Sequence, residues 1–189
     1  KMDQNNFILR YLNKYQEIIT DSVDQKKKFI EIYKLLKKYK NNKKVHVFGN
    51  GGSAAIASHF SMDLTNNSKI RCYNYNESSL ITCYSNDFKY ENWISKVIEK
   101  YGDKNDLLIL ISSSGMSKNM LNAAKTAKKL KFNKIVTLTG FNKKNNLKKL
   151  GDCNLWVNSK DYNVVENIHQ VWLLMLVDMI KAKNPKLNF

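Results

Sequence analysis

Two short loops rich in serine and glycine are the clearest chemical signal in the chain. Residues 49–53 read Gly-Asn-Gly-Gly-Ser, and residues 112–117 read Ser-Ser-Ser-Gly-Met-Ser. Glycine lets a backbone approach a ligand closely, and the first turn of a helix offers free N–H groups and the positive end of a dipole. Serine hydroxyls add donors for phosphate oxygens. Together the loops predict a cradle for a phosphate monoester, although either loop alone could simply turn the chain and cap a helix.

Neither loop completes a known nucleotide-binding motif. No Gly-Lys-Ser/Thr follows either of them, which excludes a Walker A loop. Residues 49–54 match the dinucleotide motif GxGxxG/A in part, so a dinucleotide site stays open as an alternative. The acidic residue that should follow about 20 residues later is missing, which argues against that alternative.

Two pairs of ionisable side chains occur at helical spacing. His59 and Asp63 are four residues apart, and Glu166 and His169 are three apart. Each pair shares a helix face, so the four side chains predict proton transfer or a divalent-metal site. The alternative is an ordinary surface pair and a helix–helix contact. His46 lies inside an apolar run and is predicted to be a hydrogen-bonded core histidine.

The loops and pairs must be brought together by an open parallel sheet. Apolar runs predict strands at 45–48, 70–75, 106–111, 134–138 and 154–157, and helical periodicity covers about 53–65, 90–100, 117–130 and 163–183. Residues 78–84 fit neither pattern clearly. Strands that alternate with helices predict an α/β fold with both faces of the sheet covered. Ligands of such sheets bind beyond the carboxyl ends of the strands, where both loops are expected.

The first part of the chain predicts two further helices with a hinge near Thr20. The second helix should end near Tyr39, and a basic, Asn-rich turn should follow over residues 37–44. We therefore divide the chain into a helical arm for oligomerisation, residues 1–42, and a phosphate-binding domain, residues 43–189. The arm is expected to pack on the main domain or on a partner subunit.

Composition excludes several classes of protein. The 189 residues hold 32 Lys+Arg and 16 Asp+Glu, a net charge of +16, but only Arg10 and Arg71 are arginines. Arginine is the usual reader of guanine and phosphate, so nucleic-acid binding is not expected and the lysines are predicted to be mainly solvated surface. No apolar run approaches the roughly 20 residues that span a bilayer, and no signal peptide is evident, so we expect no membrane association and a cytoplasmic location. Cys72, Cys83 and Cys153 form no CxxC pair and are predicted to be buried thiols.

The run from Val45 to Phe60, VHVFGNGGSAAIASHF, resembles the signature of the phosphoheptose isomerases, a family with the sugar-isomerase (SIS) fold. Residues 85–88, 111–117 and 138–140 resemble later segments of that family in the same order, so the resemblance covers about residues 5–182. It implies a flavodoxin-like α/β/α sandwich with a five-stranded parallel sheet, an N-terminal helical hairpin and a homotetramer. It also implies conversion of sedoheptulose 7-phosphate into a heptose 7-phosphate for surface glycans.

The resemblance also implies a role for each matching residue. Substrate contacts fall to Asn50, Gly51, Gly52 and Ser53, contacts with sugar hydroxyls to Asn86 and Asp87, and phosphate contacts to Ser112, Ser113, Ser114 and Ser117. Asp63, Glu166 and His169 are predicted to move protons. His59, Asp63 and Glu166 are predicted to hold Zn²⁺ or another divalent metal.

The acid–base positions depart from the family pattern. Asp63 stands where the family has Glu, Glu166 where it has Gln, and Leu174 where it has a second His. Two alternative functions are therefore considered for the chain. The first is an aldose–ketose isomerase acting on a heptulose phosphate or a close relative. The second is a non-catalytic SIS-type module that binds a sugar phosphate or a protein partner.

Overall fold

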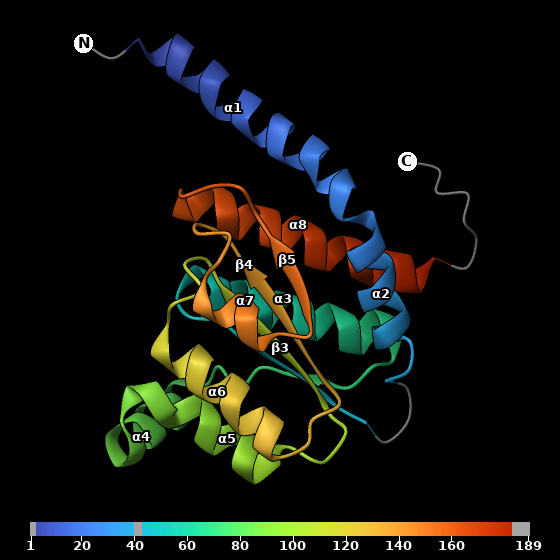
Figure 1. Ribbon diagram of the computed structural model, residues 1–189, viewed down its shortest axis with the longest axis vertical. Coiled ribbons are helices and arrows are strands. Elements are labelled where there is room, and N and C mark those ends of the chain that lie inside the picture. Colours follow the sequence, from blue (N-terminus) through green and yellow to red (C-terminus); the bar gives the residue numbers. More distant parts are fainter. Residues whose placement is uncertain (1–2, 40–42, 183–189) are drawn as a thin grey trace.

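The computed structural model describes residues 3–39 and 43–182, and it arranges them in three layers (Figure 1). A five-stranded sheet in the order β2-β1-β3-β4-β5 forms the middle layer, and every neighbouring pair of strands is parallel. This strand order is that of the flavodoxin-like fold. The predicted α/β sandwich is confirmed.

The strands are β1 (Val45–Phe48), β2 (Cys72–Tyr73), β3 (Leu107–Ser112), β4 (Lys134–Thr139) and β5 (Cys153–Trp156). The helices are α1 (Gln4–Asp21), α2 (Lys26–Leu36), α3 (Gly52–Ser68), α4 (Ser78–Phe88), α5 (Trp93–Tyr101), α6 (Lys118–Lys129), α7 (Asn146–Leu150) and α8 (Tyr162–Lys181). Two short 3-10 turns, Ser22–Gln25 and Tyr90–Asn92, complete the order.

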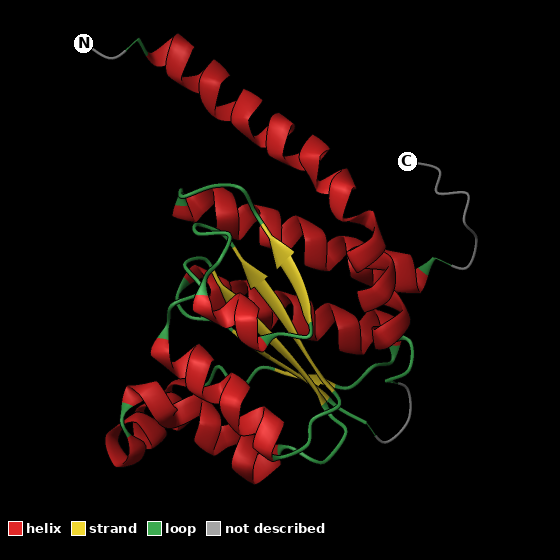
Figure 2. Ribbon diagram, in the orientation of Figure 1, coloured by secondary structure: helices red, strands yellow, loops and turns green. Residues whose placement is uncertain are grey.

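Helices cover both faces of the sheet, as Figure 2 shows. On β3, Leu107, Ile109 and Ile111 join the core on the side of α2, α3 and α8, whereas Leu108 and Leu110 join the core on the side of α5 and α6. Alternate side chains of a strand point to opposite faces. A strand that is buried on both faces therefore needs an unbroken apolar run, which is what the sequence shows there.

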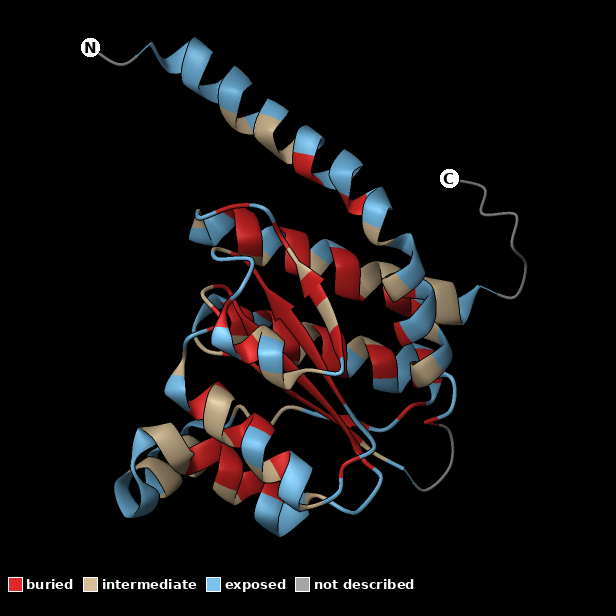
Figure 3. Ribbon diagram, in the orientation of Figure 1, coloured by how far each residue is buried: buried red, intermediate tan, exposed pale blue. Residues whose placement is uncertain are grey.

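The predicted helical arm divides at the turn Ser22–Gln25. Helix α2 buries Phe29, Ile32 and Leu36 in the main core, so it belongs to the sandwich. Helix α1 projects beyond the body, and most of it is exposed (Figure 3). The structural division thus falls before α2 and not at residue 42. Part of the predicted basic turn, residues 40–42, lies outside the described residues.

Two other predictions need correction. The strand expected over 70–75 is limited to Cys72–Tyr73, and the ambiguous segment 78–84 lies in α4, which has no buried residue. The prediction that all three cysteines are buried is wrong for Cys83, which is exposed on α4, whereas Cys72 and Cys153 are buried as predicted.

Burial raises the pKa of the Cys153 thiol to about 12. No helix within residues 3–39 and 43–182 is long and apolar enough to cross a bilayer.

Candidate active site

The two serine/glycine loops meet at the carboxyl ends of β1 and β3. These strands pair in parallel, so the loops that follow them lie side by side. A pocket of about 90 Å³ lies between them, and we call it the serine pocket. Its lining residues are Asn50, Ser53, Ile111, Ser112, Ser113, Ser114, Ser117, Tyr162 and Glu166. Since a water occupies about 30 Å³ of liquid, this volume suits a group of a few heavy atoms, such as a phosphate.

The first loop depends on its glycines. A Cβ at Gly49 would overlap the backbone of Ser53, and Gly51 has φ +54°, which favours glycine. A Cβ at Gly52 would overlap the Glu166 carboxylate. Gly51 and Gly52 are exposed and do not line the pocket themselves. Their function in the structure is to let the chain turn and to let Glu166 approach the start of α3.

The second loop presents hydroxyls toward the pocket. Ser113 Oγ is buried and has no hydrogen-bond partner among the described residues. Ser112 Oγ and Ser117 Oγ lie 3.3 Å apart, and Ser114 Oγ accepts from the Met116 N–H at 3.2 Å. A buried hydroxyl without a partner costs about 1–3 kcal/mol, and a bound anion would remove that cost. The next residue, Lys118, begins α6, whose N-terminal end favours negative charge.

Glu166 reaches the pocket from α8. Ser53 Oγ lies 3.4 Å from Glu166 Oε1 and donates to it, and the carboxylate lies over Gly52, the first residue of α3. The positive end of the α3 dipole stabilises a carboxylate at this position. The serine pocket therefore combines hydroxyl donors with one group that can accept a proton.

Asn50 is held by two residues that sequence reasoning missed. Asn50 Nδ2 donates to Asn119 Oδ1 at 3.1 Å, and Asn119 Nδ2 donates back to Asn50 Oδ1 at 2.8 Å. The Tyr90 hydroxyl donates to the same Asn50 oxygen at 3.0 Å. Asn119 is the second residue of α6, where a single asparagine gives no sequence signal. Tyr162, which lines the pocket, was also missed.

A larger cleft of about 450 Å³ adjoins the serine pocket and shares Asn50 and Ser117 with it. The cleft is also lined by Lys89, Tyr90, Glu91, Lys118 and Asn119. It offers further room for a ligand that enters the serine pocket. Small-molecule sites in proteins usually measure about 300–1,000 Å³.

Asn86 and Asp87 do not join this site within the chain. Both lie exposed on α4, where Asn86 Nδ2 donates to Asp87 Oδ1 at 3.1 Å. They line neither the serine pocket nor the adjoining cleft. Their predicted contacts with sugar hydroxyls therefore have no counterpart in the geometry of one subunit.

His59 and Asp63 pair on α3 as their spacing predicts. His59 Nε2 lies 3.3 Å from Asp63 Oδ2, and Gln170 Nε2 lies 3.2 Å from His59 Nδ1. Gln170 can only donate through this nitrogen. His59 Nδ1 is therefore the acceptor and Nε2 carries the proton that faces Asp63. Neither His59 nor Asp63 lines the serine pocket.

The predicted metal site is not assembled. No group of three or more His, Cys, Asp or Glu side chains in residues 3–39 and 43–182 is arranged to hold a metal ion. Glu166 lies at Gly52, whereas His59 is seven residues further along α3, about 10 Å at 1.5 Å per residue. His59, Asp63 and Glu166 of one subunit are therefore not placed to share a metal ion, and the proposed reaction does not use a metal.

His169 is not brought to the pocket either. Its side chain is fully buried, and Nε2 lies 3.2 Å from the carbonyl oxygen of Thr139. Burial lowers the pKa of His169 to about 4, so the ring is neutral near physiological pH. His169, which was predicted to be catalytic, is thus a core histidine. Its ring centroid lies 5.9 Å from that of Trp172.

Comparisons with known proteins find related sequences and the same fold. The model of the SIS domain matches residues 10–140. The chain is 32% identical over 185 residues to a phosphoheptose isomerase of Helicobacter pylori, covering 94% of this chain and 95% of that protein. It is also 32% identical to one of Buchnera aphidicola, over 95% of this chain and 97% of that protein. The solved structure of a phosphoheptose isomerase from Francisella tularensis superposes with a TM-score of 0.87 at 25% identity, covering 95% of this chain and 98% of that one.

Proposed function

The chain belongs to the phosphoheptose isomerase family of SIS-domain proteins, and on this premise we propose that it isomerises sedoheptulose 7-phosphate or a closely related ketose phosphate. The observation that carries the proposal is the serine pocket, where hydroxyls suited to a phosphate face a carboxylate suited to proton transfer. An isomerase that acts on a sugar phosphate needs both a phosphate site and an acid–base group.

The phosphate is proposed to bind between the hydroxyls of the second loop and the N-terminus of α6. Ser113, with its buried hydroxyl that no described residue satisfies, is the central donor, and Ser112 and Ser117 flank it. Asn50 would orient the sugar, since Asn119 and Tyr90 fix its side chain at the mouth of the adjoining cleft.

Glu166 is proposed to be the base. It takes a proton from C1 of the ketose, the C1–H electron pair becomes the C1=C2 double bond, and the C2 carbonyl oxygen gains a proton to give an enediol. The C1 hydroxyl then loses its proton as C1 becomes a carbonyl, and Glu166 returns its proton to C2. The Ser53 hydroxyl, which lines the pocket and donates to Glu166, is suited to carry the proton between the two oxygens. Asp63 faces His59 instead, and we assign it no step.

We expect Ser113→Ala to raise the KM for the sugar phosphate about tenfold or more, because a hydrogen bond to a charged group contributes roughly 1.5–3 kcal/mol. Steady-state kinetics or calorimetric binding measures the change. Ser95→Ala is the matched control, since the Ser95 hydroxyl is also buried and without a partner among the described residues but lies on α5, outside the pocket. An unchanged KM in Ser113→Ala would contradict the assigned phosphate contact.

Incubation of the purified protein with sedoheptulose 7-phosphate, followed by NMR, tests the proposed activity. The expected result is an aldose anomeric signal that grows with time. Binding of the substrate without conversion would reject the isomerase and favour the non-catalytic sugar-phosphate module.

We also propose that α1 joins copies of this chain. Ile8, Leu12 and Ile19 are exposed, and with Tyr15 they follow one another at spacings of four, three and four residues. This is the spacing of a coiled-coil seam, in which like helices bury such side chains against each other. The family resemblance, which implies a homotetramer, supports a second copy of this chain as the occupant of the seam.

Leu12→Glu should therefore lower the oligomeric state, because it places a charge in the centre of the seam. Sedimentation velocity measures the result. Asn13→Glu adds the same charge at an exposed position off the seam and should leave the assembly intact. Equal sedimentation of Leu12→Glu and the wild type as oligomers, or a wild-type monomer, would contradict the proposed seam.

A further inference from the structure

A second cavity, of about 350 Å³, lies between the turn Ser22–Gln25, α7 and the edge strand β5. It is several times larger than the serine pocket, and the two share no lining residue. It also shares none with the cleft that adjoins the serine pocket. The proposed isomerase reaction makes no use of this cavity.

Hydrogen bonds between side chains and backbone fix the walls of the cavity. Gln25 Nε2 donates to the Trp156 carbonyl at 3.1 Å, and its Oε1 accepts from the Trp156 N–H at 3.0 Å. The indole N–H of Trp156 donates to the Gly140 carbonyl at 3.1 Å, and that of Trp172 donates to Ser22 Oγ at 2.9 Å. Both aromatic walls are therefore held in place before a ligand binds, which reduces the ordering cost of binding.

Three lysines give the cavity a concentrated positive charge. Lys28, Lys143 and Lys148 line it, and none of them has a salt bridge within 4.0 Å in the described part of the chain. Lys143 Nζ and Lys148 Nζ lie 5.6 and 5.7 Å from the Trp156 ring centroid. Burial, and then the charges of Lys28 and Lys143, lower the pKa of Lys148. An anion among the three ammonium groups would relieve this repulsion.

The same cavity has an acidic side. Asp24 lines it from the 3-10 turn, and Asp21 lines it from the residue before that turn. Neither aspartate forms an ion pair with the three lysines. Carboxylates accept hydrogen bonds from hydroxyl groups and disfavour additional negative charge. The ligand should therefore be anionic at one end and rich in hydroxyls at the other.

We propose that this cavity binds a small phosphorylated polyhydroxy compound. The phosphate would lie among Lys28, Lys143 and Lys148, and the hydroxyls would face Asp21 and Asp24. This is a second binding site, separate from the serine pocket.

The tryptophans provide the test. Trp156 and Trp172 line the cavity, whereas Trp93 is buried on the other side of the sheet against Phe48. Titration of the full chain with fructose 6-phosphate, followed by ¹H–¹⁵N NMR of the indole groups, should shift the Trp156 and Trp172 signals saturably and leave Trp93 unmoved. Fructose alone should cause no shift, and inorganic phosphate alone should bind more weakly.

Variants assign the shifts to the cavity. The double variant Lys28→Gln, Lys148→Gln should weaken fructose 6-phosphate binding at least about tenfold, since each lysine supplies a charged hydrogen bond. Lys149→Gln, the exposed neighbour that does not line the cavity, should bind as the wild type does. Ser113→Ala should leave the indole shifts unchanged.

Three outcomes would overturn the proposal. The first is the absence of saturable shifts at Trp156 and Trp172. The second is equal affinity in the double variant and the wild type. The third is loss of the shifts in Ser113→Ala, which would show that the indoles report on the serine pocket. None of these depends on whether the protein catalyses isomerisation.

Discussion

Glu166→Gln should lower kcat for the isomerisation by about 10²–10⁴-fold, the usual contribution of a positioned acid–base group. The amide has the shape of the carboxylate and can still accept from Ser53, but it cannot take up the C1 proton. Substrate binding and the midpoint of thermal unfolding should change little. Enzyme kinetics, calorimetry and circular dichroism together measure these three quantities.

Glu99→Gln is a suitable control because Glu99 lies on α5, outside the serine pocket, where its carboxylate pairs with Lys96. It should leave kcat unchanged. Glu166→Asp keeps the carboxylate but shortens its reach by one methylene, so it should retain more activity than Glu166→Gln. A Glu166→Gln variant with wild-type kcat would remove Glu166 from the mechanism.

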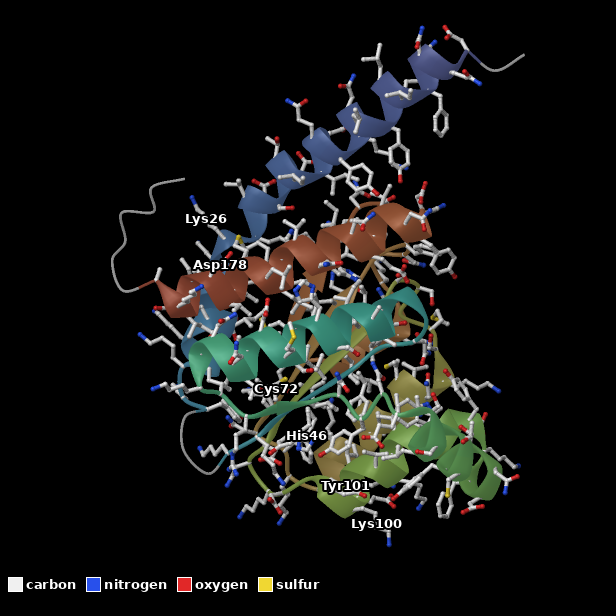
Figure 4. All side chains as sticks on the ribbon, turned by 180° about the vertical axis from the view of Figure 1, so that it is seen from behind. Lys26, His46, Cys72, Lys100, Tyr101 and Asp178 are labelled. Atoms are coloured by element: carbon white, nitrogen blue, oxygen red, sulfur yellow. The ribbon has the colours of Figure 1, made fainter. Side chains whose placement is uncertain are left out.

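Asp106→Ala should cost about 3–5 kcal/mol of unfolding free energy, because it removes a buried hydrogen-bond acceptor and leaves three donors unsatisfied. Asp106 Oδ2 accepts from His46 Nε2 at 2.8 Å and from the Asp103 N–H at 2.9 Å, and Oδ1 accepts from the Lys44 N–H at 3.0 Å. His46, labelled in Figure 4, is fully buried on β1. Urea denaturation at neutral pH measures the loss.

Stability should also depend on pH through Asp106. Burial works to raise the pKa of its carboxyl, but the hydrogen bonds from His46 and from the two backbone N–H groups outweigh burial and lower the pKa overall. The stabilisation is therefore complete above the pKa of an unfolded aspartate, about 3.9, and is lost as the pH falls through the lower folded pKa. Asp106→Ala should lose this part of the acid dependence, and Asp103→Ala, which removes an exposed partner of Lys44, should keep it. Equal acid profiles in Asp106→Ala and the wild type would contradict the assignment.

The sequence predicted the sheet because each buried strand leaves its own local pattern. The apolar run at residues 106–111 and the Ser/Gly loop after it are together enough to place a buried strand, its carboxyl end and a ligand loop. His46 was predicted as a hydrogen-bonded core histidine, and its bond to Asp106 confirms this. Helix α4 was not predicted because none of its residues is fully buried, and Leu80, Ile81 and Tyr84 pack only in part against the core, which leaves a short and weak apolar pattern.

The site was predicted less completely because spacing on a helix does not fix which neighbour a side chain meets. Glu166 and His169, three residues apart, differ by about 60° around α8 at 3.6 residues per turn. That rotation is enough for Glu166 to face α3 while His169 turns onto the carbonyl of Thr139. Gln170, only about 40° from Glu166, is the residue that reaches His59.

The predicted metal set failed for a similar reason. Spacing places His59 and Asp63 together, but it does not show that Glu166 contacts α3 two turns earlier, at Gly52. The supporting contacts of Asn50 with Asn119 and Tyr90 join residues 69 and 40 positions apart in the sequence, respectively. No local sequence pattern indicates contacts between residues so far apart.

Isomerisation in D₂O tests the central claim most directly. Sedoheptulose 7-phosphate is incubated with the wild-type protein in D₂O, and the aldose product is examined by NMR for deuterium at C2. Because Glu166 would take the C1 proton and can exchange it with solvent before returning it, we predict an aldose product that carries deuterium at C2 in at least part of its molecules. No aldose product, or a product that keeps only protium at C2, would contradict a base-catalysed isomerase.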